Sequence, residues 1–263
     1  MELHVAGNPV FAYTGGSVFD ASRPAIVFVH GAAHDHSVWA LQSRWFGRHG
    51  HAVLAVDLPG HGRSGGEPLA SIGELADWIV ALLDAADLQQ AILVGHSMGS
   101  LACLEAAARH PTRVAALALI GCAVPMAVSD ALLAAARDTA DQAYRMINQW
   151  SHAPDSLLGR HPVPGLWMPG ASLALMERSR PGALHRDLAN CNDYQGGLEA
   201  AAQVRCPTLL ILGSRDLMTP LKVGKELAKP ITNSRTAIID GAGHAMMSEA
   251  PDAVLDALRG LMG

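Results

Sequence analysis

Three side chains that lie far apart in this sequence are of the types that together carry out nucleophilic chemistry. The serine of Gly95-His-Ser-Met-Gly99 directly follows the apolar run Ala91-Ile-Leu-Val94 and precedes a helical pattern. Asp216 and His244 each follow a later apolar run. Serine is inert near neutral pH unless a base takes its proton, and the base needs an acid that orients it. The spacing G-x-S-x-G between a strand and a helix therefore makes Ser97 a candidate nucleophile.

The pattern requires its two glycines for a steric reason. Ser97 must occupy a sharp, strained turn so that its hydroxyl projects above the sheet, and side chains at Gly95 and Gly99 would collide with neighbouring strands and the following helix. Ser97 would also lie at a helix N-terminus, where the positive end of the helix dipole stabilises a developing oxyanion. The alternative is a chance glycine–serine turn, which the strand–turn–helix context disfavours.

The elements that must position these residues follow from hydrophobic patterning. Short apolar runs are continuous rather than alternating, which is typical of strands buried on both faces of a parallel sheet covered by helices. The repeated strand–helix order predicts an α/β domain. A hairpin is expected near the start, where residues 3–6 and 10–14 flank Gly7-Asn-Pro9. The expected strands are 25–29, 52–56, 91–94, 114–120, 208–212 and 236–239, and the expected helices are 38–49, 71–86, 98–110, 219–229 and 246–262.

The segment from Cys122 to Ala200 breaks this alternation. It contains helical patterns at 129–151 and 171–180, separated by several prolines, and no convincing strand. A helical insertion between two buried strands is a candidate lid. We therefore expect a core of residues 1–121 and 201–263 and a helical cap of residues 122–200.

Several segments spread along the chain resemble one family. Besides the serine motif they are His30-Gly31, Asp57-Leu-Pro-Gly-His-Gly-Arg-Ser64, Gly213-Ser-Arg-Asp216 and Gly241-Ala-Gly-His244. Together they resemble the α/β-hydrolases, in particular the lid-bearing esterases and C–C hydrolases. The resemblance implies an α/β-hydrolase fold: a mostly parallel central sheet of about eight strands flanked by helices, with a helical lid inserted before the last two strands.

The same resemblance implies roles for individual residues. Ser97 is the expected nucleophile, His244 the general base and then general acid, and Asp216 the carboxylate that orients the histidine. The expected oxyanion hole consists of the backbone N–H groups of Ala32 and Met98. A serine nucleophile argues against the dehalogenases and epoxide hydrolases of this superfamily, which attack with an aspartate.

Other side chains are alternatives for the acid or the base. Asp57 precedes the nucleophile in sequence, so a role in a turn suits it better. Asp240 lies close to the candidate base but is expected to cap a strand end, and Glu249 and Asp130 are weaker alternatives. His96 flanks the nucleophile, and because the turn directs neighbouring side chains to opposite sides we expect it to be a packing residue.

Two motifs raise the question of a cofactor. His30, His34 and His36 with Asp35 form a dense cluster, but no further grouping completes a zinc site, so no metal is expected. Gly60-His-Gly-Arg-Ser-Gly65 matches the dinucleotide pattern G-x-G-x-x-G. That pattern should open a helix, whereas here the helical pattern begins only near residue 71. We expect no cofactor.

The lid contains candidate substrate-binding residues. Ala143, Ile147 and Trp150 recur at helical spacing, a stripe that is more often core than pocket. Trp167 and Met168 lie between prolines in an expected loop and are better candidates for lining a cavity. The predicted substrate-binding set is Trp150, Trp167 and Met168.

Composition excludes several classes of partner. The chain has 263 residues, of which 50% are hydrophobic and 16% charged, with a formal net charge of −5. This rules out disorder, and such a protein has no electrostatic attraction for nucleic acid or anionic lipid.

The longest apolar stretch is interrupted by Gly121 and Pro125, so no membrane span is expected. Four dispersed cysteines favour free thiols, and without a visible secretory signal we expect a cytoplasmic protein with a small-molecule substrate.

These observations predict a serine hydrolase. The leading interpretation is a carboxylic-ester hydrolase that acts on a small apolar ester through an acyl-enzyme. C–C bond hydrolysis, lactone opening and cofactor-free perhydrolysis remain alternatives on the same residues. A hydrolase fold retained as a small-molecule receptor is the alternative of a different class, and a complete set of serine, histidine and aspartate disfavours it.

Overall fold

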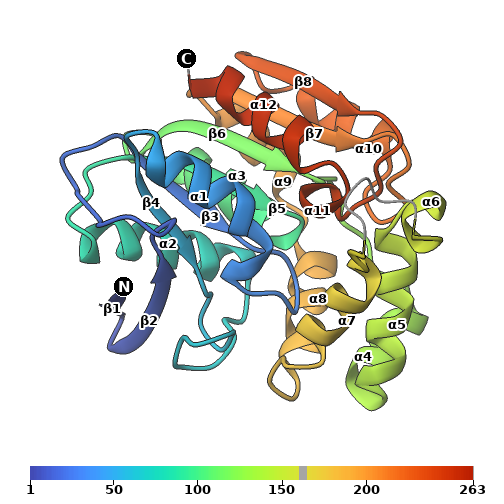
Figure 1. The fold of residues 1–263 in the computed structure, drawn as a ribbon. Coiled ribbons are helices and arrows are strands. Elements are labelled where there is room, and N and C mark those ends of the chain that lie inside the picture. Colours follow the sequence, from blue (N-terminus) through green and yellow to red (C-terminus); the bar gives the residue numbers. More distant parts are fainter. Residues whose placement is uncertain (160–164, 263) are drawn as a thin grey trace.

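A mostly parallel sheet forms the centre of the protein, seen in a computed structural model that describes residues 1–159 and 165–262 (Figure 1). Within the described residues the sheet has eight strands in the order β1-β2-β4-β3-β5-β6-β7-β8, and β3 to β8 are parallel. The fold class predicted from the sequence is therefore confirmed. The strands are β1 (Glu2–Val5), β2 (Asn8–Tyr13), β3 (Ala25–Val29), β4 (Ala52–Val56), β5 (Ala91–His96), β6 (Val114–Ile120), β7 (Thr208–Gly213) and β8 (Ser234–Ile239).

Helices cover both faces of this sheet, which explains the continuous apolar runs. Every residue of β3 and β4 is buried. One face packs against α2 (Ile72–Ala85), α3 (Met98–Arg109) and α10 (Leu221–Ala228). The other face packs against α1 (Ala40–Arg48), α11 (Met246–Glu249) and α12 (Pro251–Met262), with the short 3₁₀ helix η1 (His36–Trp39) before α1. Burial on both faces removes the polar alternation that a half-exposed strand would show.

The N-terminal hairpin is present, but its turn differs from the one expected. The turn is Ala6-Gly7, with φ of +48° and +81°, and not Gly7-Asn-Pro9. Two consecutive residues with positive φ make the tight turn whose twist matches that of the flanking strands. Asn8 and Pro9 therefore belong to β2, where Pro9 pairs with His4 of β1.

Residues 122–200 between β6 and β7 form what we call the helical insert. The expected helix over 129–151 is divided at Thr139, whose φ of −147° ends one helix before the next begins. The insert also contains helices beyond the two predicted, while Pro162 and Pro164 lie outside the described residues. Its helices are α4 (Asp130–Asp138), α5 (Ala140–Ser151), α6 (Pro154–Leu157), α7 (Met168–Met176), α8 (Ala183–Asp193) and α9 (Gly197–Gln203).

The remaining differences are small. The expected helix 246–262 is divided into α11 and α12 before Pro251, because the residue before a proline avoids the helical conformation. All four cysteines are free, as expected. None of the helices in the described part of the chain is both long and apolar enough to cross a membrane.

Candidate active site

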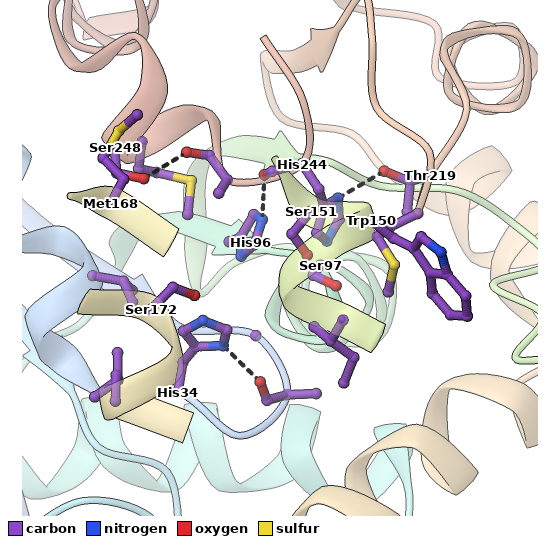
Figure 2. Close-up of a pocket in the computed structure, with 18 of the residues that line it drawn as sticks. His34, His96, Ser97, Trp150, Ser151, Met168, Ser172, Thr219, His244 and Ser248 are labelled. Atoms are coloured by element: carbon purple, nitrogen blue, oxygen red, sulfur yellow. Dashed lines mark hydrogen bonds between the residues drawn. The ribbon is translucent and has the colours of Figure 1, made fainter. Parts of the chain in front are cut away.

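Ser97 occupies a strained turn between β5 and α3. Its φ of +53° and ψ of −120° are unusual for a residue with a side chain, and its N–H donates to the Ile120 carbonyl at 2.9 Å. A backbone of this kind costs about 1–3 kcal/mol and persists only where the surroundings enforce it. Figure 2 shows Ser97 among the residues that line a cavity, with His244 and His96 close by.

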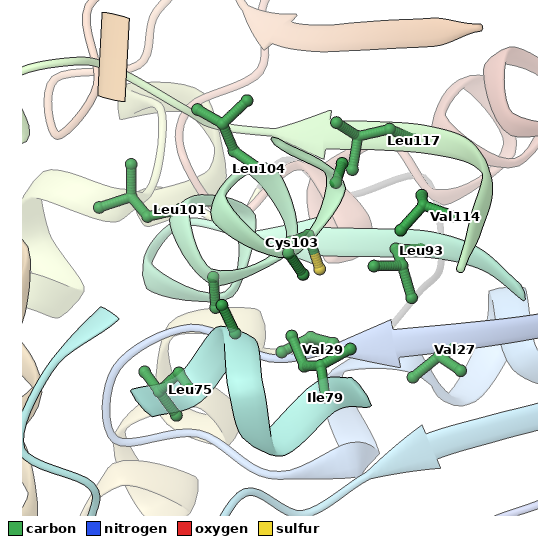
Figure 3. Packing of buried hydrophobic residues seen from close by; sticks show 14 of the residues in the cluster. Val27, Val29, Leu75, Ile79, Leu93, Leu101, Cys103, Leu104, Val114 and Leu117 are labelled. Atoms are coloured by element: carbon green, nitrogen blue, oxygen red, sulfur yellow. The ribbon is translucent and has the colours of Figure 1, made fainter. Parts of the chain in front are cut away.

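The surroundings that enforce this turn are glycines and a packed helix. A Cβ at Gly95 would collide with the backbone of Gly99, and a Cβ at Gly99 would collide with the backbone of Val29 and His30. Behind the turn, Leu101 and other side chains of α3 pack against strand and α2 side chains, as Figure 3 shows. The steric role predicted for the two glycines is confirmed, because the helix could not approach the sheet so closely with larger residues.

His244 and Asp216 are brought together at the ends of β8 and β7. His244 Nδ1 donates to Asp216 Oδ2 at 2.8 Å, and both side chains are buried. Asp216 Oδ1 accepts from the backbone N–H groups of Met218 and Thr219, at 2.8 Å each. Thr219 Oγ1 donates to Asp216 Oδ2 at 2.7 Å. The carboxylate is thus held by its own loop, and it holds the histidine ring.

These contacts keep Asp216 ionised. Burial by itself would raise the pKa of Asp216. The His244 charge and the hydrogen bonds from His244 and Thr219 outweigh burial and lower this pKa below its ordinary value. An ionised carboxylate at Nδ1 fixes the histidine tautomer so that Nε2 is available as a base.

The other face of the His244 ring is packed against groups that leave it little freedom. His96 Nε2 donates to the His244 carbonyl at 3.0 Å, and the two ring centroids are 4.6 Å apart. Burial and the neighbouring His244 charge hold the pKa of His96 well below its usual value, so this ring is neutral. Gly121 has φ of +56°, and a Cβ there would lie 3.0 Å from the His244 ring. His96 is therefore a packing residue, as predicted, and Gly121 leaves the space that the His244 ring occupies.

Ser97 and His244 line the same cavity. Within residues 1–159 and 165–262, no hydrogen bond joins the Ser97 hydroxyl to the His244 ring. Catalytic hydrogen bonds are often long without substrate and shorten in the complex, so this geometry is compatible with proton transfer. The three side chains proposed from the sequence are thus gathered at one edge of the sheet.

The loop after β3, residues 31–34, lies beside Ser97, and we call it the oxyanion loop after the role predicted for its Ala32 N–H. A Cβ at Gly31 would lie 3.1 Å from Ser97 Cβ. His30 Nδ1 donates to the Gly31 carbonyl at 2.8 Å, which orients the peptide that carries the Ala32 N–H. That N–H donates to no group in the described part of the chain. Met98 is the first residue of α3, where backbone N–H groups have no partner within the helix. Both amides are therefore available to an oxyanion.

The cavity has a volume of about 810 Å³. Its walls are mostly apolar and include Trp150 and Met168 of the insert, two of the three predicted binding residues. Trp167 is 66% exposed and does not line it. Met168 begins α7 rather than lying in the expected loop. His34 lines the cavity too, and burial lowers its pKa. In the neutral ring Nδ1 donates to the Ala32 carbonyl at 2.6 Å, so Nε2 is a hydrogen-bond acceptor.

Comparison with known proteins agrees with this geometry. A family model described as alpha/beta hydrolase fold matches residues 24–251. The chain belongs to the α/β-hydrolase family. The resemblance seen in the sequence and the hydrolase activity predicted from it are confirmed.

Individual relatives of this hydrolase include several kinds of enzyme. The pimeloyl-[acyl-carrier protein] methyl ester esterase of Aromatoleum aromaticum is 33% identical over 261 residues, which cover 91% of this chain and 100% of that enzyme. The structure of an esterase from Exiguobacterium antarcticum has a TM-score of 0.87 at 18% identity, covering 100% of this chain and 99% of that one. An enol-lactonase from Burkholderia xenovorans has a TM-score of 0.86 at 23% identity, with the same coverage. The two solved structures share the fold.

The alternative acids of this hydrolase lie elsewhere. Asp57 accepts hydrogen bonds from the backbone N–H groups of His36 and Arg63, which is the turn role expected of it. Asp240 is exposed and accepts from Ser214 Oγ. Glu249 accepts from the N–H groups of Ala153 and Gly243, and Asp130 is exposed at the start of α4. Among the described residues, only Asp216 contacts the His244 ring with a carboxylate.

One group of side chains in this hydrolase has the composition of a metal site. Ligand atoms of Asp35, His36 and Asp57 lie within 4.8 Å of one another. Each is already engaged: Asp57 Oδ1 accepts from His36 Nδ1 at 2.7 Å, and Asp35 accepts from Ser37 and pairs with Arg178. The cluster is explained by hydrogen bonds that hold the loops after β3 and β4 together.

Sequence reasoning missed some residues of the site. Thr219 supports Asp216, and a hydroxyl three residues after an aspartate in a loop is a recognisable turn pattern. Gly121 directly follows a buried strand, which is the only local indication of its role. Asp187, on the unpredicted helix α8, contacts the oxyanion loop across 154 residues, and no local pattern points to it.

Proposed function

We propose that this protein is a serine carboxylic-ester hydrolase that uses Ser97, His244 and Asp216 as its catalytic triad. The observation that carries the proposal is the 2.8 Å contact between His244 Nδ1 and Asp216 Oδ2 beside a strained Ser97 in one cavity. This arrangement supplies a nucleophile, a base and an orienting carboxylate.

The reaction proceeds in two steps. Ser97 Oγ attacks the ester carbonyl carbon while His244 Nε2 takes the hydroxyl proton, and the resulting oxyanion accepts hydrogen bonds from the Ala32 and Met98 amides. The tetrahedral intermediate collapses, the C–O bond to the alcohol breaks, and His244 returns the proton to the departing alcohol. A water molecule then attacks the acyl-enzyme with His244 as base, which releases the carboxylic acid and restores Ser97. One ester and one water give one acid and one alcohol.

The cavity favours an ester with a sizeable apolar acyl or alcohol group. At about 810 Å³ it is in the upper part of the range of about 300–1,000 Å³ that holds whole small-molecule ligands. Its apolar wall includes Leu132, Ile147, Met168 and Leu175 of the insert. The relative named above is an esterase of pimeloyl-[acyl-carrier protein] methyl ester, an ester with an acyl chain, which supports the same class of substrate. We expect a medium-length acyl ester rather than the smallest ones.

The helical insert is the proposed cap of this enzyme. Residues 122–200 supply much of the cavity wall, while residues 1–121 and 201–263 supply the triad and the oxyanion amides. A cap that covers the reacting carbonyl excludes bulk water and strengthens the electrostatic interactions within the site. The division into a core and a cap thus separates chemistry from substrate selection.

The test is Ser97→Ala with a panel of p-nitrophenyl esters of increasing chain length. Turnover should fall by about 10⁴-fold or more with the fold intact, because no other nucleophile is present at the turn. Circular dichroism and thermal melting check the fold. Near-normal esterase activity in this variant would contradict the proposal. Lactones and a vinylogous diketone in the same panel distinguish lactone opening and C–C hydrolysis, since either would then exceed the best ester in kcat/KM.

A further inference from the structure

The oxyanion loop is held by the helical insert. The Ala33 N–H donates to Asp187 Oδ2 at 2.9 Å, and the Ala33 carbonyl accepts from Ser179 Oγ at 3.0 Å. Asp187 lies on α8, and Ser179 lies in the turn after α7. Ala33 has φ of +55°, a conformation that costs about 1–3 kcal/mol for a residue other than glycine. Contacts from the insert therefore stabilise a loop conformation that is unfavourable by itself.

The peptide that Asp187 holds is the next one after the proposed oxyanion donor. The first peptide joins Gly31 to Ala32 and carries the Ala32 N–H. The second joins Ala32 to Ala33, and its N–H is the one that Asp187 accepts. The two peptides share the Cα of Ala32, so a contact that fixes the second peptide also fixes the position of the Cα to which the Ala32 nitrogen is bonded. Asp187 therefore restricts where the Ala32 N–H can lie, although it contacts only Ala33.

Asp187 is also paired with His61, and the surroundings of that ring require it to be charged. His61 Nε2 lies 2.8 Å from Asp187 Oδ2, and its Nδ1 lies 2.9 Å from the Pro59 carbonyl. The Pro59 carbonyl and the Asp187 carboxylate in its ionised form only accept hydrogen bonds, so the His61 ring satisfies both as the imidazolium, in which both nitrogens donate. The nearby His30 is the contrast: its Nε2 accepts from the Leu58 N–H at 3.1 Å, so that ring is neutral.

We propose that Asp187 and His61 form a buried ion pair between insert and core that positions the Ala32 amide for oxyanion binding. Both are positioning residues, because they act through Ala33 and do not contact the reacting atoms. The pair is 2–3% exposed, and the two side chains are 126 residues apart in sequence. The proposal rests on the oxyanion hole of the proposed function. It makes the geometry of this amide depend on the contact between Asp187 of α8 and Ala33.

The groups around His61 support its charge at neutral pH. Burial lowers the pKa of His61, but the Asp187 charge and hydrogen bond, the Pro59 carbonyl and the more distant Asp57 outweigh burial and raise it above 6.5. His30, on the neighbouring strand end, lies 5.1 Å away between ring centroids and is neutral, since burial and the His61 charge lower its pKa to about 3. The ion pair is therefore complete below pH 6.5 and is lost as the pH rises through the raised pKa of His61.

The experiment compares Asp187→Ala and Asp187→Asn with Asn190→Ala. Asn190 lies on the same helix and donates to the Leu69 carbonyl at 2.9 Å, so its removal also breaks a hydrogen bond between insert and core, but one remote from the oxyanion loop. The assay measures kcat and KM for the best p-nitrophenyl ester, with active sites counted by a serine-directed phosphonate. Thermal melting measures the structural cost of each variant.

We expect Asp187→Ala to lower kcat per active site by about tenfold to a hundredfold with little change in KM, because a misdirected amide weakens only transition-state binding. Asp187→Asn keeps an acceptor for the Ala33 N–H and should recover part of this loss. The wild type should show a decline of kcat at alkaline pH as His61 loses its proton, and Asp187→Asn should remove this decline. Asn190→Ala should leave kcat unchanged.

Equal kcat values in Asp187→Ala and Asn190→Ala would overturn the proposal, as would a change in KM alone. An alkaline decline that persists unchanged in Asp187→Asn would overturn the assignment to the ion pair. If Asp187→Ala does not fold, two other measurements decide whether the insert positions the Ala32 amide. One is the pH profile of kcat in Asp187→Asn. The other is kcat in Ser179→Ala, a variant that removes the other insert contact to Ala33. Ser97→Ala, measured alongside, separates this question from the proposed function: if it retains activity, the triad fails, whatever Asp187 does.

Discussion

Among the described residues, two histidine–aspartate pairs have both side chains buried, and they share the same central contact but have different surroundings. His244–Asp216 and His61–Asp187 both have a nitrogen–oxygen distance of 2.8 Å. In the first pair the remaining ring nitrogen is left to the cavity that contains Ser97. In the second it faces the Pro59 carbonyl. A ring with one nitrogen available can exchange a proton with a substrate, whereas a ring with two acceptors holds its proton.

The two aspartates differ in a corresponding way. Asp216 accepts two N–H groups of its own loop, so its position is set locally within the core. Asp187 accepts the N–H of Ala33, a residue of another region, so it transmits the position of α8 to the oxyanion loop. In the proposed mechanism the first histidine–aspartate contact supports proton transfer, and in the proposed positioning role the second supports backbone geometry. The groups that contact the second ring nitrogen and the carboxylate decide which of these two roles a pair has.

The largest difference between the pairs should appear when each carboxylate is neutralised. Asp216→Asn should lower kcat by about 10⁴-fold, because the amide no longer holds the tautomer in which Nε2 is the base. Steady-state kinetics with a p-nitrophenyl ester measure this. Asp240→Asn is the matched control, since Asp240 follows the neighbouring strand but contacts Ser214, and its activity should be that of the wild type. A large loss of kcat in Asp240→Asn together with wild-type kcat in Asp216→Asn would instead identify Asp240 as the acid that orients His244.

A smaller effect is expected from the support of Asp216. Thr219→Val keeps the shape of the side chain but removes the hydroxyl that donates to Asp216 Oδ2. Hydrogen bonds to charged groups contribute about 1.5–3 kcal/mol, and the two backbone donors remain, so kcat should fall by about tenfold. KM should change little. A fall as large as that of Asp216→Asn would mean that Thr219 takes a direct part in the chemistry.

The smallest effect concerns stability, where the two pairs should respond to pH in opposite directions. The lowered pKa of Asp216 gives stability that is present above 3.8 and is lost as the pH falls through that pKa. The raised pKa of His61 gives stability that is present below 6.5 and is lost as the pH rises. Asp216→Asn should therefore flatten the acid side of the Tm–pH curve and Asp187→Asn the alkaline side. Identical Tm–pH curves for Asp216→Asn and Asp187→Asn would contradict the opposite pH dependence expected of the two pairs.

Much of the fold could be predicted because its determinants are local. Strands such as β3 and β4 are continuous apolar runs, and a run of this kind can be satisfied only by burial on both faces. The sequence places the hairpin turn one residue too late at its start and two at its end, since Asn8 and Pro9 have turn propensities while the positive φ angles fall on Ala6 and Gly7. The break at Thr139 was missed because the apolar pattern continues through it.

The site residues, too, divide into those that the sequence predicts and those that only the folded chain reveals. Ser97, Asp216 and His244 follow strands of one parallel sheet, so their meeting at one edge could be predicted from strand order. Trp167 was grouped with Met168 by sequence, yet only Met168 faces the cavity, because α7 begins between them and turns one side chain inward. Asp187 could not be found, since its role depends on where α8 docks.

The sequence by itself determined the elements, the strained serine turn and the order of the chemical groups, because steric limits and burial act over a few residues at a time. The tertiary structure alone decided which ring nitrogens of His244 and His61 have a partner, and which aspartate contacts His244 and which contacts Ala33. Those choices depend on atoms within about 3 Å that belong to segments far apart in sequence, such as Ala33 and Asp187. Hydrogen bonds are selective at that range, and only the folded chain brings their partners together.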